Sequence, residues 1–335
     1  MKEILERVRA GGNLTVDEMS SVVDAIMQGA CDQDEIAQLL LGLREKGETV
    51  EEIAGAARAM RKHMTPVRTS RRDVIDTCGT GGDGSSTFNI STAAALVTAA
   101  AGVPVAKHGN RSITSKSGSA DVLAALGVNI EASVETVERC LDEVGICFCF
   151  APQMHPSMKH VAPVRKKLGV PTIFNMLGPL SNPASAPFQL LGVGKPPLRP
   201  KLSAALALLG SQRAVVVCGE DGLDEVTLGG ATFVTEVTPD GTAEHTWTPE
   251  QFGLASGDTA ALRVDGPGAS AEMVRSVLDG GKGPQRDVVV LNAAAALWTA
   301  GKSDSLDQCA GLAAEVIDSG AARKTLADLA ETSQS

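Results

Sequence analysis

The first 64 residues carry hydrophobic side chains at helical spacing in three successive runs. Residues 15–18 (Thr-Val-Asp-Glu) and 49–52 (Thr-Val-Glu-Glu) have the form of capping boxes, in which a hydroxyl and a carboxylate each satisfy a free N–H of a first helical turn. Asp32 is placed to cap the run between them. Because helices this short are stabilised mainly by packing on one another, the pattern predicts a small helical domain over residues 1–68.

From about residue 72, short hydrophobic runs of strand type alternate with longer helical runs. Strands are predicted over residues 74–76, 103–107, 146–150 and 214–218. Helices are predicted over residues 90–101, 121–126, 133–144, 271–278, 287–300 and 306–319. This alternation is typical of an α/β domain, here residues 70–335, with a mostly parallel central sheet flanked by helices. Residues 157–180 are helical and then rich in turns, so part of the segment 160–185 is expected to join the helical domain.

Composition and charge narrow the class of protein. Of 335 residues, 43% are hydrophobic and 21% charged, which is ordinary for a globular chain of about two domains. A net charge of −10 with 3% aromatic residues argues against binding to nucleic acid. No hydrophobic run approaches the roughly 20 residues of a membrane helix, and the N-terminus lacks the apolar stretch of a signal peptide. The seven cysteines include no Cys-x-x-Cys pair, so reduced thiols and a cytoplasmic location are expected.

A glycine-rich loop in residues 76–92 is the densest chemical signal. Successive N–H groups of such a loop form a concave site for anions, and the helix expected to start near Asn89 adds its positive end. The loop therefore predicts a phosphate or pyrophosphate site. Residues 79–84 (Gly-Thr-Gly-Gly-Asp-Gly) also match the dinucleotide fingerprint of nicotinamide-dependent dehydrogenases. The helix does not open at the third glycine, however, and Lys107 stands where an acidic residue should hold the ribose, so this alternative is discounted.

Two further segments follow predicted strands, where open α/β sheets bind ligands. Residues 107–121 contain Lys107, Arg111 and Lys116 among many hydroxyl side chains, which suits a second phosphate. Asp224 and Glu225 come shortly after the strand 214–218, and adjacent carboxylates near a phosphate favour Mg²⁺, although a simple turn is an equal alternative. In residues 150–167, a helix would place Arg165 to clamp a carboxylate.

The motifs taken together resemble anthranilate phosphoribosyltransferase, over nearly the whole chain. They are Asp-Thr-Cys-Gly-Thr-Gly-Gly-Asp (76–83), Thr-Phe-Asn-Ile-Ser-Thr (87–92), Lys-His-Gly-Asn-Arg-Ser (107–112), Ser-Lys-Ser-Gly-Ser-Ala-Asp (115–121), His-Pro-Ser-Met-Lys (155–159), Val-Ala-Pro-Val-Arg (161–165) and Thr-Ile-Phe-Asn-Met-Leu-Gly-Pro-Leu-Ser-Asn-Pro-Ala (172–184). The resemblance implies a fold of the nucleoside phosphorylase and phosphoribosyltransferase type, a homodimer joined through the helical domains, and a place in tryptophan biosynthesis. It also implies transfer of the 5-phosphoribosyl group of phosphoribosyl pyrophosphate (PRPP) to the amine of anthranilate, with release of pyrophosphate.

The resemblance also implies site residues. For PRPP these are Gly79, Gly82, Asp83, Thr87, Asn89, Ile90, Ser91, Thr92, Lys107, Gly109, Asn110, Arg111, Ser112, Ser115 and Ser119. For anthranilate they are Gly79, His108, Asn110, Pro152, His155, Arg165 and Gly178. For Mg²⁺ they are Ser91, Asp224 and Glu225.

The expected mechanism is a dissociative displacement at C1 of the ribose. Anthranilate's amine is neutral at pH 7, so no essential general base is expected. Lys107, Asp224 and Glu225 are expected to act electrostatically on the departing pyrophosphate. A pyrimidine nucleoside phosphorylase is the alternative within the same fold neighbourhood. Arg165 and the Phe-Asn-Met-Leu-Gly-Pro stretch (174–179) match the anthranilate enzyme better.

Overall fold

The helical domain contains the helices that the capping boxes predict. The structure is a computed structural model that describes residues 1–111 and 117–335. Its N-terminal helices are α1 (Lys2–Arg9), α2 (Val16–Met27), α3 (Gln33–Lys46) and α4 (Val50–His63). The side chains of Thr15, Asp32 and Thr49 each accept a hydrogen bond from the first turn that follows, and all three caps are reciprocal. The local sequence therefore fixes where α2, α3 and α4 begin.

In the described part of the chain, seven strands form one sheet in the order β3-β2-β1-β4-β5-β6-β7. The strands are β1 (Ile75–Gly79), β2 (Val105–Gly109), β3 (Ile146–Phe150), β4 (Phe188–Gly192), β5 (Arg213–Gly219), β6 (Thr232–Thr238) and β7 (Gly241–Trp247). Strands β1 to β5 pair in parallel, whereas β6 and β7 add an antiparallel hairpin. The predicted α/β fold with a mostly parallel sheet is confirmed.

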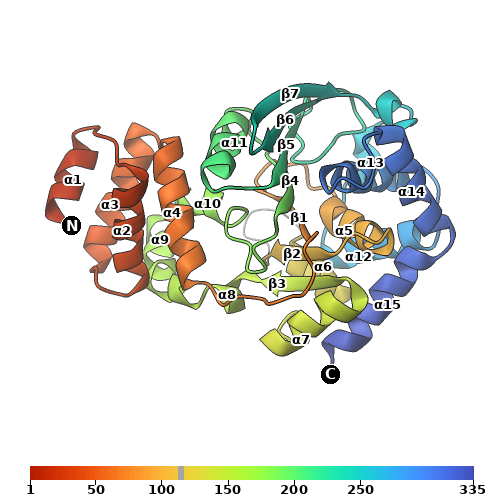
Figure 1. Cartoon of the computed structure of the whole chain (residues 1–335), viewed down its shortest axis with the longest axis horizontal. Coiled ribbons are helices and arrows are strands. Elements are labelled where there is room, and N and C mark those ends of the chain that lie inside the picture. The colour runs from red at the N-terminus through yellow and green to blue at the C-terminus, as the bar shows by residue number, and fades with distance from the viewer. Residues whose placement is uncertain (112–116) are drawn as a thin grey trace.

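Hydrophobic side chains of β5 alternate between two cores. Val215 and Val217 belong to the core under the C-terminal helices, whereas Val216 and Cys218 belong to the core on the opposite face. The first face is covered by α5 (Ile90–Ala100) and by α12 (Pro267–Leu278), α13 (Pro284–Thr299), α14 (Leu306–Asp318) and α15 (Ala321–Ser333), with α6 (Ser119–Ala125) and α7 (Val134–Arg139) at the same end of the sheet (Figure 1). Both faces are buried, as a parallel sheet requires.

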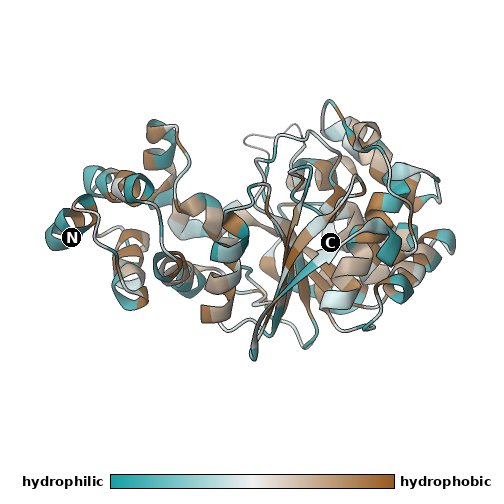
Figure 2. Cartoon of the chain, turned by 90° about the horizontal axis from the view of Figure 1, so that it is seen from above, coloured by the Kyte–Doolittle hydropathy of each residue, from teal (hydrophilic) through white to brown (hydrophobic). Residues whose placement is uncertain are grey.

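The opposite face is covered by α11 (Leu198–Leu208), and its core continues into the helical domain. Residues of α9 (Ala162–Leu168) and α10 (Phe174–Leu177) belong to the same hydrophobic cluster as residues of α2, α3 and α4. Figure 2 shows the helical domain at one end of the molecule and the strands of the sheet, largely hydrophobic in colour, between their covering helices. The segment after β3 thus returns to the N-terminal helices before β4 re-enters the sheet.

A single helix that carries both His155 and Arg165, as considered from the sequence, is not found. The structure has α8 (Ala151–Met154), a 3₁₀ helix (Pro156–His160) and α9 instead. Each of the three helices has a proline in its first two positions. Proline lacks the N–H that an interior position needs, but it fits a first turn, so the prolines divide the segment.

Several elements gave no recognised signal in the sequence, namely β4, β6, β7, α11 and α15. Strand β7 shows why: residues 241–247 (Gly-Thr-Ala-Glu-His-Thr-Trp) are mostly exposed at the sheet edge, so they need no hydrophobic alternation. Within the described residues, no helix is long and apolar enough to cross a membrane.

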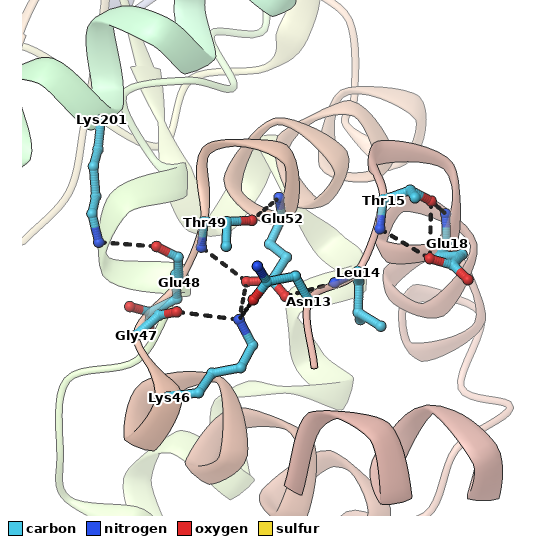
Figure 3. Close-up of polar contacts among 10 residues, drawn as sticks. All are labelled: Asn13, Leu14, Thr15, Glu18, Lys46, Gly47, Glu48, Thr49, Glu52 and Lys201. Atoms are coloured by element: carbon cyan, nitrogen blue, oxygen red, sulfur yellow. Dashed lines mark hydrogen bonds and ion pairs between the residues drawn. The ribbon is translucent and has the colours of Figure 1, made fainter. Parts of the chain in front are cut away.

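A buried ion pair ties the start of α2 to α3 and α4 (Figure 3). The Nζ of Lys46 donates to Oε2 of Glu52 at 2.7 Å, and the side chains are only 6% and 0% exposed. Lys46 also donates to Asn13 Oδ1 at 3.1 Å, while Glu52 accepts from the N–H of Leu14 and of Thr49, each at 2.9 Å. Every strong donor and acceptor of the pair therefore has a partner, which is the condition for burying two charges.

Replacing Glu52 by glutamine should destabilise the chain strongly, because it leaves the Lys46 ammonium buried without a counter-charge. We expect the free energy of unfolding, measured by urea titration, to fall by about 3–5 kcal/mol. Asp328→Asn is the matched control, since it removes one partner of the exposed Lys324–Asp328 pair and should change stability by less than about 1 kcal/mol. Equal, small losses in the two variants would contradict a stabilising role for the buried pair.

Candidate active site

The glycine loop joins the end of β1 to the start of α5. Its backbone passes through positive φ at Gly81 (65°), Gly82 (76°) and Gly84 (74°), a region that favours glycine. Asn89 caps α5, with its Oδ1 accepting from Thr92 N at 3.1 Å, so the helix begins where the sequence predicts. The loop and the helix N-terminus therefore present backbone N–H groups at the carboxyl edge of the sheet.

The two acidic residues after β5 reach directly into this loop. Asp224 Oδ2 accepts from Gly81 N at 2.9 Å, and Glu225 Oε1 accepts from Ser91 N at 3.0 Å. The predicted acidic pair thus lies against both the glycine loop and the first turn of α5. Of the two alternatives weighed for it, the geometry favours a binding site over a surface turn.

Glycines at positions 79 and 192 leave the space that Asp224 occupies, because they carry no side chain. A Cβ added at Gly79 would lie 2.5 Å from Asp224 Oδ2, and one at Gly192 would lie 1.7 Å from the Asp224 carbonyl oxygen. Similarly, a Cβ at Gly194 would lie 2.7 Å from the Cβ of Asp83. Gly192 and Gly194 are absent from the site residues expected from the sequence. The Gly-x-Gly pattern at the end of a strand was the signal that could have found them.

Three carboxylates crowd the site. Burial is the main reason that the pKa values of Asp224 and Glu225 lie above their ordinary values. Repulsion by Asp83 raises the pKa of Asp224 further, and repulsion by Asp224 raises that of Glu225. Negative charges held this close to one another favour a bound cation.

Lys107, in the middle of β2, brings a fixed cation to the same place. Its side chain is buried, and its Nζ donates to Thr77 O at 2.6 Å and to Ser91 Oγ at 3.1 Å. Burial lowers the pKa of this ammonium, while the nearby Asp76 carboxylate opposes the shift. The ammonium is therefore held at the glycine loop and not in solvent. At the loop it can bind a phosphate.

The donor set fits Mg²⁺ better than a softer metal. Asp224, Glu225 and Ser91 offer only oxygen atoms, and Ser91 is held beside Glu225 by its backbone N–H. Among the described residues, no group of three or more His, Cys, Asp or Glu side chains is arranged to hold a metal ion by itself. A magnesium ion here would therefore share its coordination with phosphate oxygens of a ligand, as Mg²⁺ commonly does.

A pair of buried histidines lies next to this edge. His108 Nδ1 donates to Gly178 O at 2.9 Å, and its Nε2 lies 3.2 Å from Nε2 of His155, within hydrogen-bond distance. Burial lowers the pKa of His108 to about 3 and that of His155 to about 4. Both rings are therefore neutral near pH 7. Pro152 lies in the first turn of α8, the short helix that ends directly before His155.

Arg165 occupies α9, in the part of the chain that returns to the helical domain. Its Nη2 donates to Asn175 Oδ1 at 3.3 Å, and its guanidinium carbon lies 5.8 Å from the centre of the Phe174 ring. Burial lowers the pKa of the guanidinium, which remains charged because an arginine pKa starts so high. Arg165 is thus a positioned cation that can bind a carboxylate.

The other expected PRPP contacts differ in how they are placed. The backbone of Thr87 forms an isolated antiparallel β-bridge with that of Arg263. The side chain of Ile90 is buried in the core. Gly109 lies against Ser119, because a Cβ added at Gly109 would lie 2.2 Å from Ser119 Oγ. Asn110 Oδ1 accepts from the N–H of Arg111 at 2.7 Å.

The guanidinium of Arg111 is held by carboxylates: it pairs with Asp121 at 3.2 Å and with Glu131 at 3.6 Å. A phosphate would have to compete with both of them. Ser112 and Ser115, together with Lys116, lie outside the described residues.

Comparisons with known proteins agree on one family. Residues 71–323 match the model of the glycosyl transferase family, a/b domain, and residues 2–64 match that of its helical bundle domain. The chain is 51% identical to the anthranilate phosphoribosyltransferase of Rhodopirellula baltica, over 98% of this chain and 96% of that protein. It is 49% identical to that of Moorella thermoacetica, over 97% and 96%.

Solved structures give the same result. The anthranilate phosphoribosyltransferase of Thermus thermophilus superimposes with a TM-score of 0.93 and 44% identity, covering 99% of each chain. That of Saccharomyces cerevisiae, in complex with PRPP and Mg, superimposes with a TM-score of 0.91 and 29% identity, covering 99% of this chain and 97% of that one.

The histidine pair should make stability depend on pH. The pKa values fall from 6.5 to about 3 and 4, so between these limits the unfolded chain binds protons that the folded chain does not. The folded state is therefore most stable, as far as the pair is concerned, above pH 6.5. The free energy of unfolding decreases as pH falls below 6.5, because protons bind the histidines of the unfolded chain first. From pH 7 to pH 5, we expect His155→Gln to lose roughly 2 kcal/mol less unfolding free energy than the wild type. Parallel pH curves from urea unfolding would contradict this assignment.

Proposed function

The chain belongs to the anthranilate phosphoribosyltransferase family, and from this membership we propose that it transfers the 5-phosphoribosyl group of PRPP to the amine of anthranilate and releases pyrophosphate, as a step of tryptophan biosynthesis. The relatives confirm the resemblance stated from the motifs, and they favour this family over a nicotinamide-dependent dehydrogenase. The observation that best supports this proposal is that the glycine loop, Lys107 and the pair Asp224–Glu225 lie together at one edge of the sheet.

Departure of pyrophosphate is the difficult part of this reaction, since negative charge builds on the leaving group as the C1–O bond breaks. The N–H groups of the glycine loop and the ammonium of Lys107 are placed to stabilise that charge. They are fixed before the substrate arrives, so no reorganisation is needed during the reaction. Mg²⁺ bound by Asp224, Glu225 and Ser91 would supply further stabilisation of the phosphate oxygens.

Anthranilate carries a carboxylate and a neutral aryl amine. Arg165 is the side chain suited to its carboxylate, with Asn110, Pro152 and Gly178 as further contacts carried over from the family motifs. Binding the carboxylate would hold the amine in line with C1, and such positioning lowers a barrier without any chemical step by the protein.

We propose no essential general base. The ring nitrogens of His108 are both engaged, one by Gly178 O and the other by His155, so His108 is not free to take a proton. The amine needs none removed before it attacks C1. It can release its proton to water once the new C–N bond has formed.

We also propose that residues 1–68 with part of 160–185 form the helical domain, that residues 70–335 form the α/β domain, and that two copies associate through the helical domains. In support, residues of α1, α2 and α3 and their adjoining turns line a groove of about 540 Å³. Its lining combines apolar and acidic side chains, among them Met1, Ile4, Val22, Asp17, Glu18 and Glu35. All seven cysteines lie among the described residues and are free, which supports a reducing, cytoplasmic location.

The acidic pair should be required for turnover. In a mixture of protein, PRPP, Mg²⁺ and anthranilate, we expect metal-dependent loss of anthranilate fluorescence. Asp224→Asn/Glu225→Gln should reduce the rate by at least about 10²-fold, because both carboxylates that would bind the metal are lost. Glu220→Gln is the matched control, since Glu220 is acidic and exposed nearby and should keep the wild-type rate. If the wild type binds PRPP but leaves anthranilate unchanged, the acceptor is a different molecule.

Sedimentation equilibrium tests the proposed homodimer. The wild type should have twice the chain mass of 34.5 kDa. Ile4→Glu should shift it toward the monomer, because it places a charge in the groove at the contact between copies. Leu208→Glu serves as the control, since Leu208 is 57% exposed on α11, outside the helical domain, and should leave the mass unchanged. A monomeric wild type at assay concentrations would overturn the proposal.

A further inference from the structure

Arg165 differs from Arg213 and Arg286 in the kind of partner that it binds. Arg286 binds both oxygens of Asp318, at 2.7 and 2.9 Å, and Arg213 binds Glu236 at 2.7 Å. Among the described residues, no carboxylate lies within ion-pair distance of Arg165. Its hydrogen-bond acceptor is the neutral amide of Asn175, and its guanidinium lies near the Phe174 ring. The positive charge is thus oriented without being neutralised.

The orientation of the Asn175 side chain is fixed by a second bond. Its Oδ1 accepts from the N–H of Thr172 at 3.0 Å as well as from Arg165 at 3.3 Å. Since a backbone N–H can only donate, the oxygen rather than the nitrogen of this amide must face Thr172, and the same oxygen meets Arg165. Asn175 therefore joins the guanidinium to the turn that starts α10.

That turn rests on a rigid base. Phe174 and Leu177, on either side of Asn175 in α10, are 6% and 0% exposed in the core shared with the helical domain. Arg44 of α3 donates to Pro171 O at 3.2 Å, which ties the preceding loop to the same domain. Asn175 itself is exposed. It is a polar side chain on a well-packed element, as a side chain that orients a neighbour should be.

We propose that Asn175 is a positioning residue for the acceptor carboxylate: it aims the Arg165 guanidinium and, being neutral, leaves the guanidinium charge for the ligand. This inference rests on the proposed function, in which Arg165 binds the carboxylate of anthranilate. An acidic side chain at position 175 would keep the bond to Thr172 N but would pair with Arg165 and compete with the ligand. Charge as well as shape therefore selects asparagine over aspartate here.

Two variants separate this role from a purely structural one. Asn175→Ala removes the acceptor, and Asn175→Asp keeps it but adds a negative charge. We expect KM for anthranilate to rise about tenfold in Asn175→Ala and further in Asn175→Asp, with KM for PRPP unchanged. If Asn175 serves only to accept the hydrogen bond from Thr172 N, Asn175→Asp should behave as the wild type, and that result would overturn the proposal. Gln28→Ala removes an exposed amide elsewhere in the helical domain and is the matched control.

Benzoate gives a readout that does not depend on turnover, because it has the carboxylate of anthranilate but no amine. Its dissociation constant, measured by equilibrium titration in the presence of PRPP and Mg²⁺, should rise in both variants in parallel with KM for anthranilate. If the wild type binds benzoate but does not consume anthranilate, the proposed function fails while the role of Asn175 is still measured. If benzoate binds equally well to the wild type and both variants, or does not bind to the wild type, the inference fails.

Discussion

Two adjacent, largely buried carboxylates are the constraint on which the rest of this site depends. Asp224 and Glu225 repel one another and Asp83, and burial deprives them of the water that would screen them. Hydrogen-bond donors of the surrounding chain lie at the same edge of the sheet. They are the N–H of Gly81, the N–H of Ser91 and the ammonium of Lys107. Positions 79 and 192 require glycine, because Asp224 occupies the space that a Cβ would fill.

The sheet and the helical domain divide the work of binding. Five parallel strands bring the groups suited to phosphate together at their carboxyl ends, and all of these come from the α/β domain. Arg165, by contrast, stands on α9, which shares a core with α2, α3 and α4. In the proposed reaction the two substrates would be held by parts of the chain with different packing, and their relative position would depend on how the helical domain packs on the sheet.

Neutral partners recur where the ligand's own charge must count. Arg165 is oriented by an amide, and His108 is oriented by a carbonyl oxygen and a second neutral imidazole. In other parts of the structure, such as Lys46 with Glu52, buried charges are compensated fully within the protein. Arg165 thus differs from Lys46, whose charge the protein itself neutralises.

The sequence by itself determined the start of α2, α3 and α4, the strand 146–150 and the α/β class, because caps and hydrophobic periodicity are local properties of a few adjacent residues. It also carried the family motifs, and with them the candidate residues. Tertiary structure alone decided that β7 forms an exposed edge and that Gly192 faces Asp224. It also joined Asn175 to Arg165, ten residues apart. Such contacts depend on how distant or separately folded segments pack, and no local pattern encodes that packing.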